Sequence, residues 1–443
     1  MNGHDKDDAA RVGCPHSLKE VDLFGPGAQE HWYAAYPILH DQAPVMRIEG
    51  EGLLPGTDAY ILTMHEDINR VVRDWARFQP TMMLAVENVA KAGVPPFEVP
   101  NVNAMIASAA TLRRDEASWR AHRKELTDPW VGPGATRHEE MILGHVDDLI
   151  DRWIVRDGPI DFVAEFARPL PQRTMASVLG FPLEDIPQLE AWGNAQVFAF
   201  VHGKGHRNTI TSEQAKEQHR ILDGFSDYVS EKTREKRANP CDDMVSFLTQ
   251  VHYSPIDRKL TDEEVNGVVY AMLIGGLETT QYAIAEQAQL LCENPSIFTR
   301  LMDDPSRIRV FVEEGMRLRS PTQGLSTRVT TQDEVFQGVE VPAGSLLHMR
   351  FAAANIDPKA FDDANDLKLE RKAPTRHLAF SAGLRSCPGA TLSRVEQMIA
   401  WRRLCERFEA VSFAEGNDFL HQPGIMLGLN QLHLHFKPAT GAA

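Results

Sequence analysis

One of the five cysteines, Cys387, has neighbours that suit chemistry at its sulfur. Pro388 follows it directly, and apolar residues at helical spacing run from 392 to 404. Since proline favours the first position of a helix, we expect a helix to begin at the sulfur. The free N–H groups and the dipole of that helix start would lower the pKa of the thiol and stabilise a thiolate.

The residues around Cys387 also leave space and supply charge. Gly383 and Gly389 carry no side chain, which lets the backbone approach a flat and bulky group. Arg385 adds a cation two residues before the sulfur. A thiolate beside open space and a cation suits the iron of a porphyrin, whose acidic side chains need a positive partner.

A second candidate site lies inside a long helix predicted from Thr261 to Glu293. Gly275 and Gly276 are adjacent in its interior, where each costs about 1 kcal/mol relative to alanine. Room for a ligand would compensate for that cost. Thr279 can donate its hydroxyl to the Gly275 carbonyl four residues earlier, which would loosen the helix and open a groove.

The segment around Cys387 resembles the haem-binding signature Phe-x-x-Gly-x-Arg-x-Cys-x-Gly of the cytochrome P-450 family, through Phe380, Gly383, Arg385, Cys387 and Gly389. It departs at Ser381, where many members have glycine, and we expect a small loss of loop flexibility there. The resemblance implies a mainly α fold of the bacterial type, with small peripheral β-sheets enclosing haem b. Cys387 would be the axial iron ligand, and Phe380 and Gly275 would lie against the haem.

Other family landmarks follow in the expected order. Gly275-Gly276-Leu277-Glu278-Thr279 is similar to the oxygen-activation site, which implies that Thr279 acts on dioxygen and that Glu278 relays protons. The pair Glu314 and Arg317 resembles the family's Glu-x-x-Arg, a structural ion pair, with Arg371 as a further member of its network. The resemblance also implies that four residues hold the haem propionates: Trp119, Arg123, Arg328 and Arg385.

These residues imply a monooxygenase that inserts one atom of O2 into a hydrophobic small molecule, by hydroxylation or oxidative demethylation. The chain has no flavin or nicotinamide fingerprint, so electrons would come from a separate iron–sulfur ferredoxin and its reductase. Two alternatives stay open: a peroxide-using or non-oxygenating haem-thiolate enzyme, and a non-catalytic haem sensor or ligand carrier. Glu278 and Thr279 favour the oxygenase, because the alternatives do not need dioxygen activation.

Basic residues on the two helices expected beside the thiolate predict a dock for an acidic ferredoxin. They are Arg113, Arg114, Arg120, Arg123, Lys124, Arg394, Arg402 and Arg403. The substrate pocket is predicted only as a set of apolar candidates. They are Met82, Met83, Leu84, Met105, Ile106, Phe198, Phe200, Ile274, Leu325 and Met426.

The composition sets broader limits on function. With 46 Lys+Arg against 62 Asp+Glu, the 443-residue chain has a net charge of −16, which argues against nucleic-acid binding. The other four cysteines form no Cys-x-x-Cys pair and are interpreted as buried small hydrophobic residues. Their number and spacing suggest a reducing, cytoplasmic compartment. No apolar run is long enough for a membrane span. We expect a monomer with a disordered tail over 1–20 and one domain over 21–443.

Periodicity predicts helices over 141–155 and 213–236 in addition to 261–293. Strand patterns occur at 45–64, at 334–348 with a hairpin around Gln337-Gly338, and as a pair within 424–436. The stretches 81–108 and 197–211 are poorly periodic, and we expect long loops or short helices there. Two interpretations stay open for them: functional lids, or simple surface irregularity.

Overall fold

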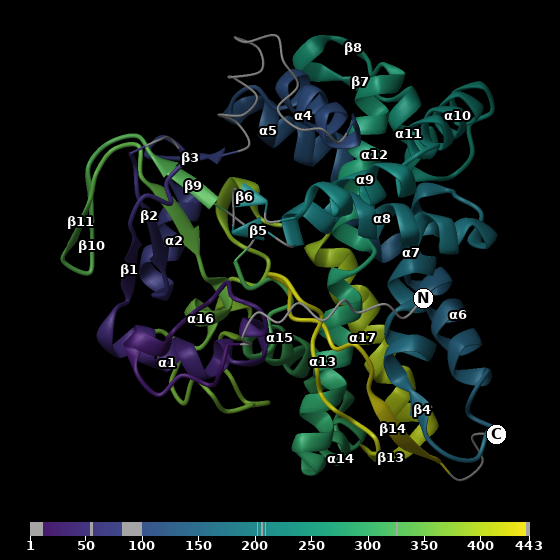
Figure 1. The fold of residues 1–443 in the computed structure, drawn as a ribbon. Helices are drawn as coiled ribbons and strands as arrows, with labels where there is room; N and C mark the ends of the chain where they lie inside the picture. The colour runs from purple at the N-terminus through teal and green to yellow at the C-terminus, as the bar shows by residue number, and fades with distance from the viewer. Residues whose placement is uncertain are drawn as a thin grey trace.

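Helices predominate in the computed structural model, which describes residues 12–53, 56–81, 100–201, 203–204, 207–208, 210–324 and 327–439 (Figure 1). The first eight α-helices are α1 (Trp32–Gln42), α2 (His65–Arg73), α4 (Pro100–Leu112), α5 (Glu116–His122), α6 (Glu139–Asp151), α7 (Pro169–Leu179), α8 (Ile186–Val201) and α9 (Ser212–Ile221). The remainder are α10 (Phe225–Ala238), α11 (Met244–Gln250), α12 (Asp262–Gly276), α13 (Thr279–Glu293), α14 (Pro295–Asp303), α15 (Ile308–Leu318), α16 (Phe351–Asn355) and α17 (Ala390–Arg407). Two π-helical turns, η3 (Arg123–Thr127) and η5 (Val163–Ala167), precede or follow these helices.

The largest sheet has five strands in the order β1-β2-β12-β9-β3 and lies beside α1 and α2 (Figure 1). Its strands are β1 (Val45–Ile48), β2 (Ala59–Leu62), β3 (Phe78–Pro80), β9 (Thr327–Thr330) and β12 (Leu346–Met349). Only β2 and β12 run parallel among these described pairs, with Leu347 opposite Tyr60. The sheet matters for the site because β9 carries Arg328.

The other sheets are small and lie at the edges. The hairpin of β10 (Glu334–Phe336) and β11 (Val339–Val341) turns at Gln337 and Gly338, both with positive φ, which confirms that prediction. A three-stranded sheet joins β13 (Phe408–Phe413), β14 (His433–Pro438) and β4 (Ile160–Asp161). Two-residue pairs complete the set: β5 (Gly203–Lys204) with β6 (Arg207–Asn208), and β7 (His252–Tyr253) with β8 (Arg258–Lys259).

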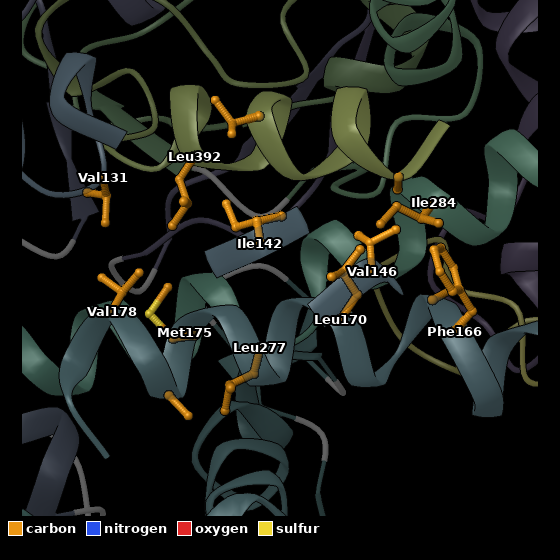
Figure 2. Close-up of a cluster of buried hydrophobic side chains, with 14 of the residues drawn as sticks. Val131, Ile142, Val146, Phe166, Leu170, Met175, Val178, Leu277, Ile284 and Leu392 are labelled. Carbon is orange, nitrogen blue, oxygen red and sulfur yellow. The ribbon is translucent and has the colours of Figure 1, made fainter. Parts of the chain in front are cut away.

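The main apolar core lies where α6, α7, α13 and α17 meet, and Figure 2 shows their side chains converging. Ile142 and Val146 of α6 are fully buried there, as the helical stripe over 141–155 predicts. Leu392 anchors the start of α17 to this core, and its N–H donates to the Val131 carbonyl at 3.2 Å. The helix that follows Cys387 therefore rests on the most buried part of the molecule.

Three predicted elements differ from the structure. The helix expected over 213–236 is divided into α9 and α10 at Gly224, whose φ of 77° belongs to the left-handed region. The helix expected over 261–293 is divided into α12 and α13. The strand pair expected within 424–436 is absent from those described residues, because β14 instead pairs with β13 and β4.

The two poorly periodic stretches lie partly outside the described residues. Within the described parts, α4 covers 100–108 of the first stretch, and the second contains the end of α8, up to Val201, and the short strands β5 and β6. No helix among the described residues is long and apolar enough to cross a membrane. The division into a tail over 1–20 and one domain over 21–443 stays a prediction; of the tail, Val12 donates its N–H to the Pro26 carbonyl at 2.8 Å.

His421 joins three segments that are distant in the sequence. Its Nδ1 lies 2.8 Å from Glu30 Oε2, and its Nε2 lies 3.1 Å from Glu286 Oε1 on α13. Burial lowers the pKa of His421, but the two carboxylates outweigh it and raise the pKa to about 9. A charged imidazole therefore ties the N-terminal region and the C-terminal segment to α13.

Candidate functional site

Cys387 lies in a tight loop that ends at α17. Its N–H donates to the Phe380 carbonyl at 2.9 Å, and the N–H of Ser386 donates to the Gly383 carbonyl at 3.2 Å. The helix begins at Ala390 with Gly389 as its N-cap, so the expectation that it begins at the sulfur is wrong by three residues. Pro388 is therefore in the loop and not at the first helical position.

The pKa of the Cys387 thiol is raised, whereas the sequence predicted that it would be lowered. Burial raises it, and this effect outweighs the lowering by the N–H groups of Gly389 and Ala390 and by the charges of Arg123 and Arg394. The stabilising groups for a thiolate are therefore present, as expected, but they are too weak alone to overcome desolvation. An additional positive charge at the sulfur, such as a bound metal ion, would reverse the balance.

The backbone of the loop turns twice through the left-handed region. Gly383 has φ of +73°, and a Cβ there would lie 3.0 Å from the Val72 carbonyl oxygen on α2. Ser381 has φ of +57°, a conformation that costs a non-glycine residue roughly 1 kcal/mol. The departure at Ser381 therefore costs backbone strain, and not the loss of flexibility expected from the sequence.

A buried network that sequence reasoning missed holds this loop in place. Glu313 accepts from Arg394 Nε at 2.7 Å and lies 2.8 Å from His377 Nε2. The Arg394 guanidinium also lies over the Phe380 ring at 4.5 Å. The sequence did contain an indication of this network, because Glu313 precedes Glu314. Glu313 binds Arg394 and His377, whereas Glu314 binds Arg317.

The predicted ion pair of Glu314 and Arg317 is fully buried, with both side chains 0% exposed. It is bidentate, at 2.7 and 3.0 Å, and Arg371 Nε adds a contact of 2.6 Å to the same carboxylate. Arg317 also donates to the Asn355 carbonyl at 3.0 Å, while Asn355 Oδ1 accepts from Leu378 N–H at 2.6 Å. The network therefore reaches the chain that enters the Cys387 loop.

The break between α12 and α13 has the predicted hydrogen bond. Thr279 Oγ1 donates to the Gly275 carbonyl at 2.7 Å. The two glycines serve different purposes: a Cβ at Gly276 would lie 2.2 Å from Met175 Cε, whereas a Cβ at Gly275 meets nothing within 4 Å. A side chain at Gly276 would therefore displace the end of the Met175 side chain on α7, whereas Gly275 faces open space, as a ligand would need.

Glu278 forms the start of a polar chain at the same break. The Tyr282 hydroxyl lies 3.2 Å from Glu278 Oε2 and 3.2 Å from Gln422 Oε1. Burial raises the pKa of Glu278, against the lowering by the Tyr282 hydrogen bond. The raised pKa lets the Glu278 carboxyl keep its proton at a higher pH than a solvent-exposed glutamate does, which suits a proton carrier. Tyr282 was not predicted, although its position four residues after Glu278 places both on one helix face.

A hydrogen bond between Thr280 and Ser393 joins the helix break at Thr279 to the helix that follows the Cys387 loop. Thr280, directly after Thr279, and Ser393, six residues after Cys387, have hydroxyl oxygens 2.8 Å apart in the core. The Thr279 break and the Cys387 loop thus belong to one rigid assembly of α13 and α17.

Two of the four predicted propionate donors, Trp119 and Arg385, are in contact, and Arg328 is close enough for its charge to act on Arg385. The Arg385 guanidinium lies 4.3 Å from the ring centroids of both Trp75 and Trp119. Burial, with the charges of Arg328 and Arg113, lowers the pKa of Arg385 to about 8. Arg328 is 7% exposed and bonds the Thr327 carbonyl, and burial lowers its pKa to about 10. No carboxylate pairs with either arginine among the described residues.

Arg123 is placed differently. Its Nη1 donates to the Ser386 carbonyl, directly before Cys387, and its Nε lies 3.5 Å from Asp128. The buried indole N–H of Trp119 and the Nε and Nη2 of Arg385 have no partner. These orphaned donors fit a ligand that carries carboxylates, as the haem propionates do. No residue from 379 to 391 is fully buried, which also fits a bulky group beside the loop.

The substrate-pocket candidates are only partly described. Met82, Met83, Leu84 and Leu325 lie outside the described residues, as does the side chain of Phe200. Met105, Ile106 and Met426 belong to apolar clusters, with Ile106 and Met426 buried, so they serve as core in this structure. Ile274 and Phe198 are partly exposed, and Ile274 directly precedes the open position at Gly275.

Most of the predicted basic dock is paired or buried. Arg394 binds Glu313, Arg403 binds Asp147 and Glu406, and Arg120 binds Glu116. Arg113 is half-buried against the Trp119 ring, and Arg123 is turned to Ser386. Three members are exposed and form no ion pair among the described residues: Arg114, Lys124 and Arg402. The dock is therefore much weaker than its eight residues suggest.

The chain resembles known proteins over most of its length. It is 25% identical over 408 residues to the polyketide biosynthesis cytochrome P450 PksS of Bacillus subtilis, covering 89% of this chain and 94% of the relative. It is 26% identical to the vitamin D(3) 25-hydroxylase of Pseudonocardia autotrophica, covering 95% of this chain and 98% of the relative. It is 27% identical to the mycinamicin IV hydroxylase/epoxidase of Micromonospora griseorubida, covering 91% of each chain.

Solved structures agree with the fold. The crystal structure of CalO2 superposes with a TM-score of 0.78 at 23% identity, covering 94% of this chain and 99% of that one. A mutant of P450 EryK bound to erythromycin B superposes with a TM-score of 0.73 at 25% identity, covering 91% of this chain and 95% of that one. The model of the cytochrome P450 family matches residues 85–436, a range that contains the Cys387 loop, the α12–α13 break and the arginine cluster. The chain therefore belongs to the cytochrome P450 family, whose members bind haem and include the hydroxylases and oxygenases that this chain resembles.

Proposed function

We propose that this enzyme binds haem b through Cys387 and inserts one atom of O2 into a hydrophobic small molecule. The observation that carries the proposal is the Thr280–Ser393 hydrogen bond, at 2.8 Å, because it fixes Thr279 and Glu278 to the helix that follows Cys387. A thiolate-ligated haem, when bound, supplies oxygen activation and favours O–O cleavage. The orphaned donors of Trp119 and Arg385 support the choice of a cofactor with two carboxylates.

The chain's own residues supply the protons. Reduction of O2 to one inserted oxygen atom and one water consumes two electrons and two protons. We assign proton supply to Glu278, which exchanges protons with the Tyr282 hydroxyl at 3.2 Å, and we assign the last donor position to Thr279. Because the Thr279 hydroxyl points to the Gly275 carbonyl, its oxygen is held at the open face of the helix.

The substrate is proposed only as a class. The similarity to a vitamin D(3) 25-hydroxylase and to a mycinamicin IV hydroxylase/epoxidase favours the hydroxylation or epoxidation of a hydrophobic small molecule. Ile274, beside open Gly275, supports an apolar surface over the reacting position. Titrating candidate compounds and recording the shift of the haem spin state would identify ligands that displace water from the iron.

The reduced carbon-monoxide difference spectrum tests the thiolate. We expect the long-wavelength Soret band that is typical of haem-thiolate proteins, and its loss in Cys387→Ser. Cys405→Ser is the matched control, because Cys405 also lies on α17 and its pKa, raised by burial to about 12, keeps it a neutral thiol. A histidine-type band in folded wild-type protein, or an unchanged band in Cys387→Ser, would refute the assignment.

Thr279→Ala tests the oxygenase against the alternatives. We expect continued NADPH consumption with a surrogate ferredoxin system, but release of hydrogen peroxide in place of product, because the proton donor is lost. Product formation from added peroxide should change much less. If Thr279→Ala leaves the ratio of product to NADPH unchanged, Thr279 has no role in oxygen use.

We propose a separate iron–sulfur ferredoxin as the electron donor and a reducing, cytoplasmic location for the enzyme. The three exposed cations of the predicted dock, Arg114, Lys124 and Arg402, are the positions that support ferredoxin binding. Reversing two charges, in Lys124→Glu with Arg402→Glu, should slow reduction at low ionic strength and little at high ionic strength. Equal rates for both proteins at low salt would remove this face as the docking site.

A further inference from the structure

Arg113 is a half-buried cation that has no role in the family pattern described above. It directly follows α4, and its backbone N–H donates to the Ala109 carbonyl at 2.9 Å. Its guanidinium lies 4.6 Å from the Trp119 ring centroid. The same ring carries Arg385 at 4.3 Å, so both cations share one indole.

No acidic partner compensates for Arg113 among the described residues. The acids nearest in the sequence are engaged elsewhere: Asp115 caps α5 through Ser118, Glu116 pairs with Arg120, and Glu125 accepts from Ser254. Arg113 Nε is buried without a hydrogen-bond partner. Burial lowers the pKa of Arg113 to about 10, which still leaves the guanidinium charged at neutral pH.

The surroundings of Arg113 make the absence of an anion costly. Arg113 and Arg385 are close enough for their charges to interact, and Arg328 adds a third. His122 is buried and held neutral, because burial and the charges of Arg113 and Arg123 lower its pKa well below the usual range. Three guanidinium groups without a carboxylate would repel one another in a region of low dielectric. A ligand with two negative charges would relieve this repulsion, and a haem has two propionates.

We propose that Arg113 binds a haem propionate, in addition to the four donors predicted from the family signature, and thereby couples the end of α4 to the cofactor. The inference rests on the proposed haem site. Its consequence concerns α4, which packs against α12 through the bond from Ser108 Oγ to the Glu264 carbonyl at 3.1 Å. Through Arg113, haem retention would depend on the position of a helix that also carries the substrate-pocket candidates Met105 and Ile106.

The proposal is tested by haem release and by the reduction potential of the holoenzyme. Purified holoenzyme is mixed with an excess of a haem-scavenging apoglobin, and the transfer of ferric haem is followed by absorbance. We expect Arg113→Gln to release haem about tenfold faster or more, because the variant loses a charge-assisted hydrogen bond to the propionate. The rate of haem release from Arg113→Lys should lie between those of wild type and Arg113→Gln, because lysine keeps the charge but lacks the planar guanidinium fork.

Arg114→Gln is the matched control: it is the adjacent arginine, it is exposed, and it removes the same formal charge. Release from this variant should stay within about twofold of wild type. Loss of the positive charge at Arg113 should also lower the reduction potential of the haem, because a nearby cation favours the reduced iron. Arg114→Gln should shift the potential less, since water screens its charge.

Two outcomes would overturn the proposal. Haem release from Arg113→Gln that matches Arg114→Gln would show that no propionate depends on Arg113. Faster release with an unchanged potential in both Arg113→Gln and Arg113→Lys would show only loosened packing on Trp119. A failure of the underlying haem assignment is distinguishable, because wild-type protein would then lack the thiolate-type carbon-monoxide spectrum before any Arg113 variant is measured.

Discussion

Glu396 should make the enzyme less stable as the pH rises, and a single isosteric substitution should remove that dependence. The residue lies on α17, is 3% exposed, and has one carboxyl oxygen, Oε2, with no hydrogen-bond partner. Burial raises its pKa to about 8, and a hydrogen bond with Thr174 of α7 only partly opposes this. The carboxyl is therefore protonated in the folded protein at neutral pH, whereas it ionises near pH 4.5 in the unfolded chain.

The sign and size of the effect follow from this difference. Between pH 4.5 and pH 8 the folded state holds a proton that the unfolded state has lost, so each pH unit favours unfolding by about 1.4 kcal/mol. Below that window both states are protonated, and above it both are ionised, so the dependence stops at each end. From pH 5 to pH 7 the expected loss from this one group is about 3 kcal/mol.

Glu396→Gln replaces a neutral acid by a neutral amide of similar size. Equilibrium denaturation of wild-type and variant holoenzyme, followed by far-UV circular dichroism at a series of pH values, gives the difference in free energy of unfolding. The free energy of unfolding of the variant should rise relative to that of wild type by about 1.4 kcal/mol for each pH unit from pH 5 to pH 8, and the difference should then level off. Glu406→Gln, on the exposed side of the same helix, should show no such slope. A flat difference for Glu396→Gln would mean that the carboxyl is ionised in the fold, and the burial argument would be wrong.

Three further predictions concern single residues. Ser381→Gly should raise the thermal midpoint, by up to about 1 kcal/mol of stability, because it relieves the positive φ and removes a buried hydroxyl without a partner, whereas Ser381→Ala should give no such gain. His421→Gln should cost about 2 kcal/mol below pH 6.5 and progressively less as the pH rises through about 9, measured as the gap between denaturation curves. Arg371→Gln should lower the free energy of unfolding by about 2–3 kcal/mol, because it removes one of two cations on the buried Glu314 carboxylate. The thermal midpoint and the fraction of protein purified with haem should both fall. A normal midpoint in Arg371→Gln would show that Arg317 alone satisfies Glu314.

The local hydrogen bonds of the site could be predicted from sequence, because they depend on spacing. Thr279 lies four residues after Gly275, which is the separation at which a helical hydroxyl reaches a carbonyl. Glu314 and Arg317 are three residues apart and face each other for the same reason. The hairpin at Gln337-Gly338 follows from turn chemistry alone. Each of these features needs only the chain's own geometry.

The features that the sequence did not reveal depend on tertiary contacts. The partner of Arg394 is Glu313, 81 residues earlier, and no pattern within α17 indicates it. The start of α17 at Ala390 and the raised pKa of Cys387 both depend on how the loop is buried against other segments. The close approach of the Met175 side chain on α7 to Gly276 is likewise a contact from outside the helix, and no pattern within 261–293 indicates it.

The arginine cluster shows how a fold can hold charges that repel one another. Its members come from the end of α4, from β9 and from the Cys387 loop, so no local interaction brings them together. The rings of Trp75 and Trp119 provide flat surfaces on which guanidinium groups stack at 4.3 to 4.6 Å, which offsets part of the desolvation cost without neutralising any charge. A carboxylate from the chain at this place would satisfy the cations and leave nothing for a ligand to bind. Because the charge is held by aromatic surfaces and not by acids, the binding of an anionic cofactor is coupled to the stability of the three segments that meet there.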